Sequence, residues 1–187
     1  MKRTLIIVVF TIFGLKIFGQ DRFTYNQQGL SPTYIVTEIP GLNQAALFDK
    51  AILWIKETYR NPDKVIKTTV EKEMIRFEGF QDYGICTKTG LGGLICHDVF
   101  YTIELEFRDN KFKFTPVELR QRVPVSQYSA GGFLPIDLRD GSGYYNKQGS
   151  LRNIYETVPT SIEMLFNEFN SRISLFLSSE KDESEGW

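Results

Sequence analysis

The clearest hydrophobic pattern in the chain is an alternation between residues 99 and 108. The odd positions from Val99 to Phe107 are apolar, and the even positions from Thr102 to Arg108 are polar. Successive side chains of a β-strand point to opposite faces of its sheet. The alternation therefore predicts a strand with one face in the core and the other in solvent.

A second strand is predicted to fold back on the first through Asp109-Asn110, two residues that tolerate tight-turn conformations. This turn places apolar side chains opposite apolar ones and an acid opposite a base: Phe107 with Phe112, Leu105 with Phe114, and Glu106 with Lys113. Past Pro116 the apolar side chains change from even to odd positions. This change predicts a β-bulge near Pro116.

The other periodic segments lie on both sides of this hairpin. β-Branched and aromatic residues predict strands over 34–39, 65–72 and 74–80. Asn43 is a suitable cap for a helix whose apolar residues recur at helical spacing up to Tyr59. A final helix is predicted from about Pro159, with an apolar face from Ile162 to Phe176.

The order of these elements predicts an α+β fold: a strand, a helix, an antiparallel run of about four strands and a closing helix. Both helices are expected on one face of an antiparallel sheet of about five strands. A chain of this length folds as one domain, which we place at residues 34–178. Residues 20–33 are expected to be a polar lead-in segment, and residues 179–187 a flexible acidic tail.

The first 19 residues have the layout of a secretory signal peptide. Lys2 and Arg3 precede an apolar run from Leu5 to Phe13, and the small residue Gly19 lies at the expected end. An uncleaved membrane anchor is the alternative, but a spanning helix needs roughly 20 apolar residues and this run is shorter. We therefore expect a periplasmic or secreted domain with no stable membrane span after cleavage.

The charge balance argues against nucleic acid as a partner. The whole chain has a net charge of −1, and removal of the predicted signal with its three basic residues leaves a net charge of −4. Neutralisation of phosphates by Lys and Arg supplies most of the affinity for DNA and RNA. An acidic domain without a basic stripe is a poor candidate for that function.

Cys86 and Cys96 are the only cysteines, and an oxidising compartment favours a disulfide between them. Two free thiols or a metal site are the alternatives, since Cys86 and Cys96-His97-Asp98 contain zinc-ligand types. Structural zinc needs four convergent ligands, whereas consecutive residues of an extended segment point to opposite faces. We expect a disulfide and no metal.

The stretch from Val125 to Asn153 is rich in Gly and Ser and shows neither helical nor strand periodicity. Long connections of this kind are usually binding loops or disordered, and a packed or merely flexible loop is the alternative. Aromatic and arginine side chains among small residues suit an adaptable contact surface. The candidate ligand-binding or partner-binding residues are Tyr128, Phe133, Arg139, Tyr144 and Tyr145.

The sequence contains no recognisable catalytic constellation. His97 is the sole histidine, and no nucleophile lies in a strand-to-helix elbow. Glu104 and Glu106 share a face of the predicted strand about 6–7 Å apart, near the carboxylate spacing of glycosidases. The same spacing is common on charged, solvated strands, and Lys113 is predicted opposite Glu106.

Gly90–Gly93 lacks the Lys and the helix of a phosphate loop, so no cofactor is expected.

Three segments carry a family resemblance: Glu38-Ile39-Pro40-Gly41-Leu42-Asn43, the helix with Ala51, Trp54 and Ile55, and the hairpin Tyr101 to Phe114 around Arg108-Asp109-Asn110-Lys111. On these segments the chain resembles the exported domain of unknown function (DUF) 4468 family with a TBP-like fold. The resemblance covers about residues 34–178. It implies a curved antiparallel sheet backed by two helices and an extracytoplasmic setting, and it supplies no catalytic residues.

These observations predict an exported, non-enzymatic binding or interaction module for an envelope protein or glycan, acting through its sheet face or the loop after Val125. A hydrolase of envelope glycan or peptide is the alternative, with Asp98, His97, Glu104 or Glu106 as acid and base. A structural subunit of a larger envelope assembly is a third reading, which an exposed apolar patch would support.

Overall fold

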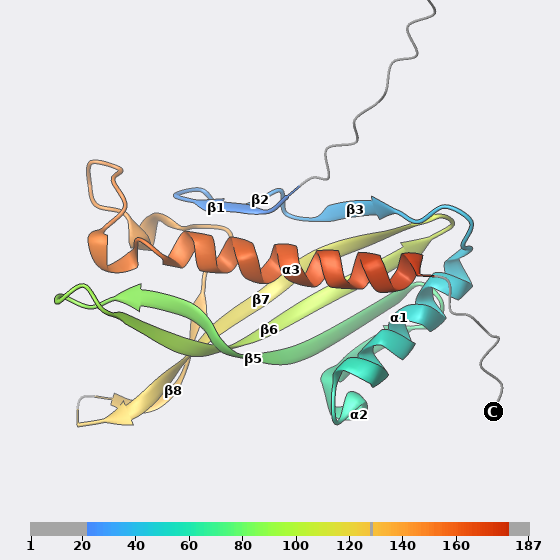
Figure 1. The fold of residues 1–187 in the computed structure, drawn as a ribbon, viewed down its shortest axis with the longest axis horizontal. Coiled ribbons are helices and arrows are strands. Elements are labelled where there is room, and N and C mark those ends of the chain that lie inside the picture. The colour runs from blue at the N-terminus through green and yellow to red at the C-terminus, as the bar shows by residue number, and fades with distance from the viewer. Residues whose placement is uncertain (1–21, 128, 180–187) are drawn as a thin grey trace, which may run out of the picture.

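The computed structural model describes residues 22–127 and 129–179 (Figure 1). The predicted signal peptide at residues 1–19 and all but the first residue of the predicted acidic tail lie outside the described residues. Within the described ranges, no helix is long and apolar enough to cross a membrane.

The described strands form an antiparallel main sheet and a small β-ribbon. Neighbouring strands of the main sheet follow the order β3-β7-β6-β5-β4, and β8 also pairs with β7. The strands are β3 (Ile35–Glu38), β4 (Ile66–Val70), β5 (Met74–Lys88), β6 (Leu94–Arg108), β7 (Lys111–Ser126) and β8 (Ser129–Ile136). The ribbon pairs β1 (Thr24–Asn26) with β2 (Gly29–Ser31). The predicted α+β class is confirmed, and the main sheet has six strands rather than about five.

The β6–β7 hairpin has the predicted register, with Phe107 opposite Phe112 and Leu105 opposite Phe114. Asn110 adopts a φ of 61° in the turn, a conformation that Asn tolerates better than most residues. Farther along, the pairing shifts by one residue: Ile103 pairs with Pro116, but Thr102 pairs with Glu118. The predicted bulge is therefore confirmed, and Val117 is its extra residue.

Two long helices, α1 (Gln44–Thr58) and α3 (Val158–Ser178), accompany the short helix α2 (Pro62–Val65). Asn43 caps α1 as predicted, because its side-chain oxygen accepts a hydrogen bond from the Ala46 amide at 2.9 Å. The predicted first helix thus begins as expected and ends near Tyr59, before Pro62 starts α2.

Both long helices cover the same face of the main sheet (Figure 1). On β6, the Tyr101 ring lies 4.4 Å from Phe169 of α3, and the Phe107 ring lies 5.8 Å from Phe48 of α1. Tyr101 and Phe107 are an even number of residues apart on one strand, so they point to the same face. The odd residues of β6 therefore form the floor of the core, as the alternation predicts.

The N-terminal ribbon belongs to the fold, although the sequence pattern placed it in a lead-in segment. Phe23, Tyr25 and Leu30 are buried. The Phe23 backbone exchanges two hydrogen bonds of 2.9 Å with the side-chain amide of Asn167 on α3. The three apolar side chains are too widely spaced among polar residues to give a periodic signal, yet their burial means that the packed domain begins before Tyr34.

The segment from Val125 to Asn153 is not one long loop, as its composition indicated. It contains the end of β7, all of β8, and the 3₁₀ turn η1 (Ser142–Tyr144), and it ends where η2 (Asn153–Tyr155) begins. Gly131 and Gly132 both adopt positive φ in the middle of β8. Glycines interrupt the alternation that identifies a strand, which is why the sequence pattern missed it.

The main sheet divides into two arms where β6 and β7 stop pairing, beyond the pair Val99 and Gln121. We call residues 82–98 the β5–β6 arm, and residues 122–127 together with 129–133 the β7–β8 arm. Figure 1 shows the two arms diverging, with the β5–β6 arm running beside the beginning of α3. Each arm is a two-stranded hairpin with its own register.

A hydrogen-bonded tyrosine pair joins buried Tyr101 of β6 to half-buried Tyr59 at the end of α1. The Tyr101 hydroxyl lies 2.6 Å from the Tyr59 hydroxyl, so the polar end of each ring has a hydrogen-bond partner. Gly79 lies opposite Tyr101 on β5. A Cβ atom at Gly79 would lie 2.2 Å from the Tyr101 hydroxyl oxygen. The absence of a side chain at residue 79 therefore makes room for the Tyr101 ring.

The substitution Gly79→Ala should lower the free energy of unfolding by about 2 kcal/mol, because the added methyl group collides with a buried ring that has no space to move. Urea unfolding measures this change. Gly90→Ala is the matched control, since a Cβ at Gly90 meets nothing within 4 Å. Equal stability of the two variants would contradict the packing argument.

Burial raises the pKa of Tyr59 to about 12, and its hydrogen bond to Tyr101 opposes part of this shift. A tyrosine in the unfolded chain ionises near pH 10. The stability contributed by neutral Tyr59 is therefore fully present below pH 10 and is lost as the pH rises towards 12. In the Tyr59→Phe variant, the free energy of unfolding should fall less steeply with pH between pH 10 and 12. The two slopes should differ by at most about 1.4 kcal/mol per pH unit. Urea unfolding at several pH values tests this, and identical slopes would refute it.

Candidate binding face

The face of the main sheet opposite α1 and α3 is the candidate functional surface. We call it the open face. It is built by the even residues of β6 and by the residues that pair with them on β5 and β7. Large apolar side chains on this face are exposed, among them Phe80 and Phe133.

Three phenylalanines from three strands form a cluster on the open face, which we call the aromatic triad. Phe80 of β5, Phe100 of β6 and Phe133 of β8 lie in a row, with ring centroids 5.0 Å apart for the first two and 4.7 Å for the last two. Their planes are inclined at 60° and 82°, which is edge-to-face packing. Phe80 and Phe133 are each 41% exposed. The triad is thus packed within itself and still presents apolar surface to solvent.

Arg120 joins the triad to the charged part of the face. Its guanidinium carbon lies 5.6 Å from the centroid of the Phe100 ring, and Nη2 donates a hydrogen bond of 2.6 Å to Glu78. Its buried Nε lies 3.4 Å from Glu118 and makes no hydrogen bond among the described residues. Arg120 therefore covers one side of Phe100 and keeps some unused hydrogen-bonding capacity.

Ion pairs between neighbouring strands surround the triad. Arg76 donates to Glu104 from both Nε and Nη2, at 3.0 and 2.5 Å. Lys67 lies 3.4 Å from Glu78, Arg122 lies 3.2 Å from Asp98, and Lys113 pairs with Glu106. Pairs of opposite charges on adjacent strands commonly stabilise a solvated sheet face.

The residues considered for acid–base catalysis do not converge on one position. Asp98, Glu104 and Glu106 lie on the open face, and each is paired with a cation of the neighbouring strand. His97 precedes Asp98 on β6 and therefore points to the other face. The expected pairing of Glu106 with Lys113 is confirmed. The geometry agrees with the reading of these carboxylates as a charged outer surface.

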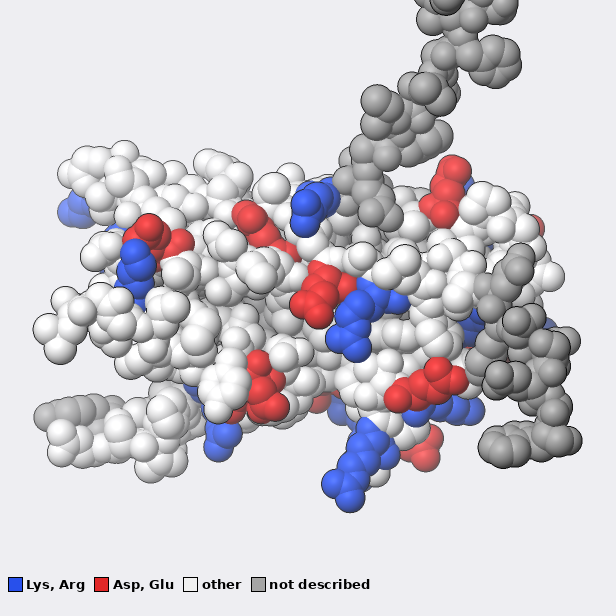
Figure 2. Space-filling view, in the orientation of Figure 1, with Lys and Arg blue, Asp and Glu red and all other residues white. Residues whose placement is uncertain are grey.

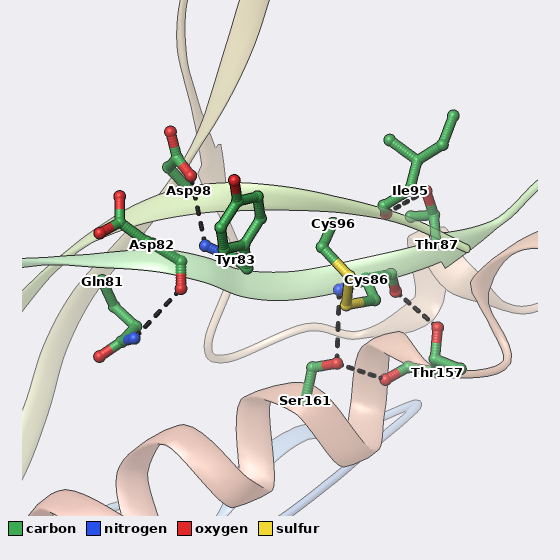
Figure 3. The surroundings of a disulfide bond; sticks show 10 residues. All are labelled: Gln81, Asp82, Tyr83, Cys86, Thr87, Ile95, Cys96, Asp98, Thr157 and Ser161. Atoms are coloured by element: carbon green, nitrogen blue, oxygen red, sulfur yellow. Dashed lines mark hydrogen bonds between the residues drawn. A yellow bond between two sulfur atoms is a disulfide. The ribbon is translucent and has the colours of Figure 1, made fainter.

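The predicted disulfide between Cys86 and Cys96 is confirmed, and it joins β5 to β6 in the β5–β6 arm (Figure 3). The start of α3 lies against the same place. The Cys86 amide donates to the Ser161 hydroxyl at 3.4 Å, and the Thr157 hydroxyl donates to the Cys86 carbonyl at 2.6 Å. These contacts satisfy the backbone of an otherwise open strand edge.

The described residues include no group of three or more His, Cys, Asp and Glu placed to hold a metal ion. Both cysteines are used in the disulfide. On the helix-covered side, the described residues show cationic and anionic side chains intermingled (Figure 2). This view presents no continuous cationic track.

The structure separates the four described members of the five binding residues predicted from the sequence. Phe133 belongs to the aromatic triad. Tyr144 packs edge-on between Tyr25 and Tyr155, with centroids at 6.1 and 5.2 Å, and its burial raises the pKa of its hydroxyl. Tyr145 forms an isolated bridge with Leu151. Arg139 lies on the exposed connection after β8, and Tyr128 lies outside the described residues.

Sequence reasoning missed Phe80 and Phe100, although a signal for them exists. Within β6 the odd residues are the core residues, so an aromatic residue at the even position 100 is an apolar side chain on the solvent face. Phe80 pairs directly with Phe100 on β5. The aromatic residue at position 100 does not fit the alternation of core residues, and this misfit could have identified Phe100 and, through strand pairing, Phe80.

Comparison with known proteins gives a family and a fold. The model of the family described as "Domain of unknown function (DUF4468) with TBP-like fold" matches residues 34–120. No curated protein matches the chain. A DUF4468 family protein from Bacteroides ovatus is similar in structure, with a TM-score of 0.52 and 13% identity over 80% of this chain and 86% of that one. A TBP-like protein from Parabacteroides distasonis gives a TM-score of 0.53 and 9% identity over 79% and 92% of the two chains.

These two structures support the fold alone, because their sequences are so different from this one. The family resemblance seen in the strand 34–39, the first helix and the central hairpin is confirmed by the matched residues. Residues 34–120 therefore match the model of the DUF4468 family of domains with a TBP-like fold, and both solved structures share this fold.

Proposed function

We propose that this domain is an exported, non-enzymatic binding module that holds a protein partner on its open face. The observation that carries the proposal is the aromatic triad, which exposes apolar rings in the middle of a face bordered by ion pairs. An apolar centre with a polar rim is typical of protein interfaces. Aromatic and Arg side chains are also the commonest residues to carry binding energy there.

The ring geometry favours a protein partner over a glycan. Sugar rings bind most readily on a flat aromatic face that is open to solvent. Here the rings of Phe80 and Phe133 meet Phe100 edge-to-face, and the Arg120 guanidinium lies over Phe100. The corrugated surface that results suits the apolar side chains of a protein partner, which can fit between the rings.

Two observations support export. The disulfide between Cys86 and Cys96 is compatible with a location outside the cytoplasm, where disulfides persist. The first 19 residues have the composition of a signal peptide, although they lie outside the described residues.

The same face gives less support to hydrolysis of envelope glycan or peptide, the alternative function. Glycoside hydrolysis in most families needs two carboxyl groups that flank one scissile bond. Glu104 and Glu106 are instead each held by a cation of the neighbouring strand, Arg76 and Lys113. A substrate would have to displace both ion pairs before either carboxylate could transfer a proton.

Replacing Phe133 by Ser should reduce the recovery of the partner at least tenfold in a cross-linking pull-down from the native envelope, as expected for a central aromatic anchor. Phe133 is partly exposed, so the variant should remain folded, which circular dichroism verifies. Leu175→Ser is the matched control, because Leu175 is an exposed apolar residue of α3, away from the open face. Equal recovery with Phe133→Ser and the parent protein would contradict the proposal.

Export predicts that the protein recovered from its native host has lost its first residues and contains no free thiol. Intact-mass analysis should give a chain that begins near Gln20, and alkylation should label two cysteines only after reduction. A protein that retains residues 1–19 and reacts without reduction would argue against export. This result would not test the proposal that the open face binds a partner.

A further inference from the structure

One edge of β7 carries a gap between two neighbouring strands. Residues 111–114 of β7 pair with β3, and residues 119–126 pair with β8 on the same edge. Residues 115–118 lie between these two pairings and have a strand partner only on the β6 side. The bulge at Val117 occurs within this stretch.

A hollow of about 280 Å³ lies at this gap. Its wall is mostly apolar, formed by Leu30 of β2, Pro116 and Val117 of β7, and Leu138 of the connection after β8. Three polar residues, Thr33, Thr115 and Arg139, also line the hollow. The site thus combines an apolar wall with two hydroxyls and one guanidinium.

The side chains of Thr115 and Arg139 are without partners within the described part of the chain. The Thr115 hydroxyl is buried and has no hydrogen-bond partner. The Arg139 side chain makes none of the ion pairs, hydrogen bonds or ring contacts that hold the arginines of the open face. Buried polar groups are nearly always hydrogen-bonded, so an unpartnered hydroxyl inside a hollow indicates a missing acceptor or donor.

The backbone that carries Arg139 is held in place. The Arg139 amide donates to the Asp137 carboxylate at 2.8 Å, and the Leu30 amide donates to the Leu138 carbonyl at 2.8 Å. Gly29, at a φ of 92°, lies so close that a Cβ there would be 2.5 Å from the Arg139 carbonyl carbon. The ribbon therefore fixes one wall of the hollow before any ligand arrives, which limits the ordering that binding requires.

The nearby carboxylates do not use Arg139. Glu104, which lies opposite Thr115 on β6, is held by Arg76, and Glu118 lies beside Arg120. The guanidinium of Arg139 is therefore available to an anion that enters from solvent. A carboxylate is the anion that best fits, because it can accept from a guanidinium and from a hydroxyl together.

We propose that this hollow binds an apolar group that carries a carboxylate, with Arg139 and Thr115 donating to the carboxylate and Leu30, Pro116, Val117 and Leu138 enclosing the apolar part. The C-terminal residue of a peptide and a fatty acid both have this chemistry. The site is separate from the aromatic triad, so it does not depend on the proposed function of the open face.

NMR titration of the ¹⁵N-labelled protein tests the site, with N-acetyl-leucine, hexanoate and the uncharged N-acetyl-leucinamide as ligands. The two carboxylates should shift the amide signals of Thr115, Val117 and Leu138 saturably, and the amide should bind at least tenfold more weakly. Arg139→Gln should weaken carboxylate binding about tenfold, as expected for one charge-assisted hydrogen bond. Arg172→Gln, at an exposed arginine of α3, is the matched control and should change nothing.

Thr115→Val removes only the hydroxyl and should weaken binding several-fold with the fold intact. Tighter binding of N-acetyl-leucine than of hexanoate would identify a peptide terminus, and the reverse order a fatty acid. The proposal is overturned if neither carboxylate gives saturable shifts, if the amide binds equally well, or if Arg139→Gln has no effect.

Discussion

Tyr101 is buried where β5, β6, α3 and the end of α1 meet, and this burial decides which face of the sheet is left open. Its ring lies against Phe169 and above Gly79, while its hydroxyl bonds to that of Tyr59. Because of these contacts, the odd residues of β6 face the helices. Since side chains alternate along a strand, the same contacts place Phe100 on the opposite face. The aromatic triad is therefore a geometric consequence of how the core is packed.

Much of the central architecture could be predicted from local rules. The alternation from Val99 to Phe107, the turn at Asp109-Asn110 and the phase change at Pro116 each correspond to an observed feature of the hairpin. Asn43 predicted the start of α1, because its own side chain makes the capping hydrogen bond. Such predictions succeed because a few neighbouring residues determine the local structure.

Features that depend on distant residues were harder to predict. The ribbon at Phe23 and Tyr25 is stabilised by Asn167 and Glu163 of α3, more than 130 residues away. β8 has glycines where a strand usually has side chains, and only its pairing with β7 defines it. Phe133 was singled out from the composition of a supposed loop, whereas its actual partner is Phe100, a residue whose orientation only the assembled sheet reveals.

The two arms of the divided sheet are held in place by different kinds of contact. The β5–β6 arm is cross-linked by the disulfide and fastened to α3 through Thr157 and Ser161. The β7–β8 arm is joined across the fork by the ion pair of Asp98 with Arg122 and by the ring contact of Phe100 with Phe133. Surface ion pairs contribute little free energy. A molecule that binds to all three rings contacts Phe80 and Phe100 of the central sheet and Phe133 of the β7–β8 arm at once, so its affinity includes the free energy of holding that arm in a single orientation.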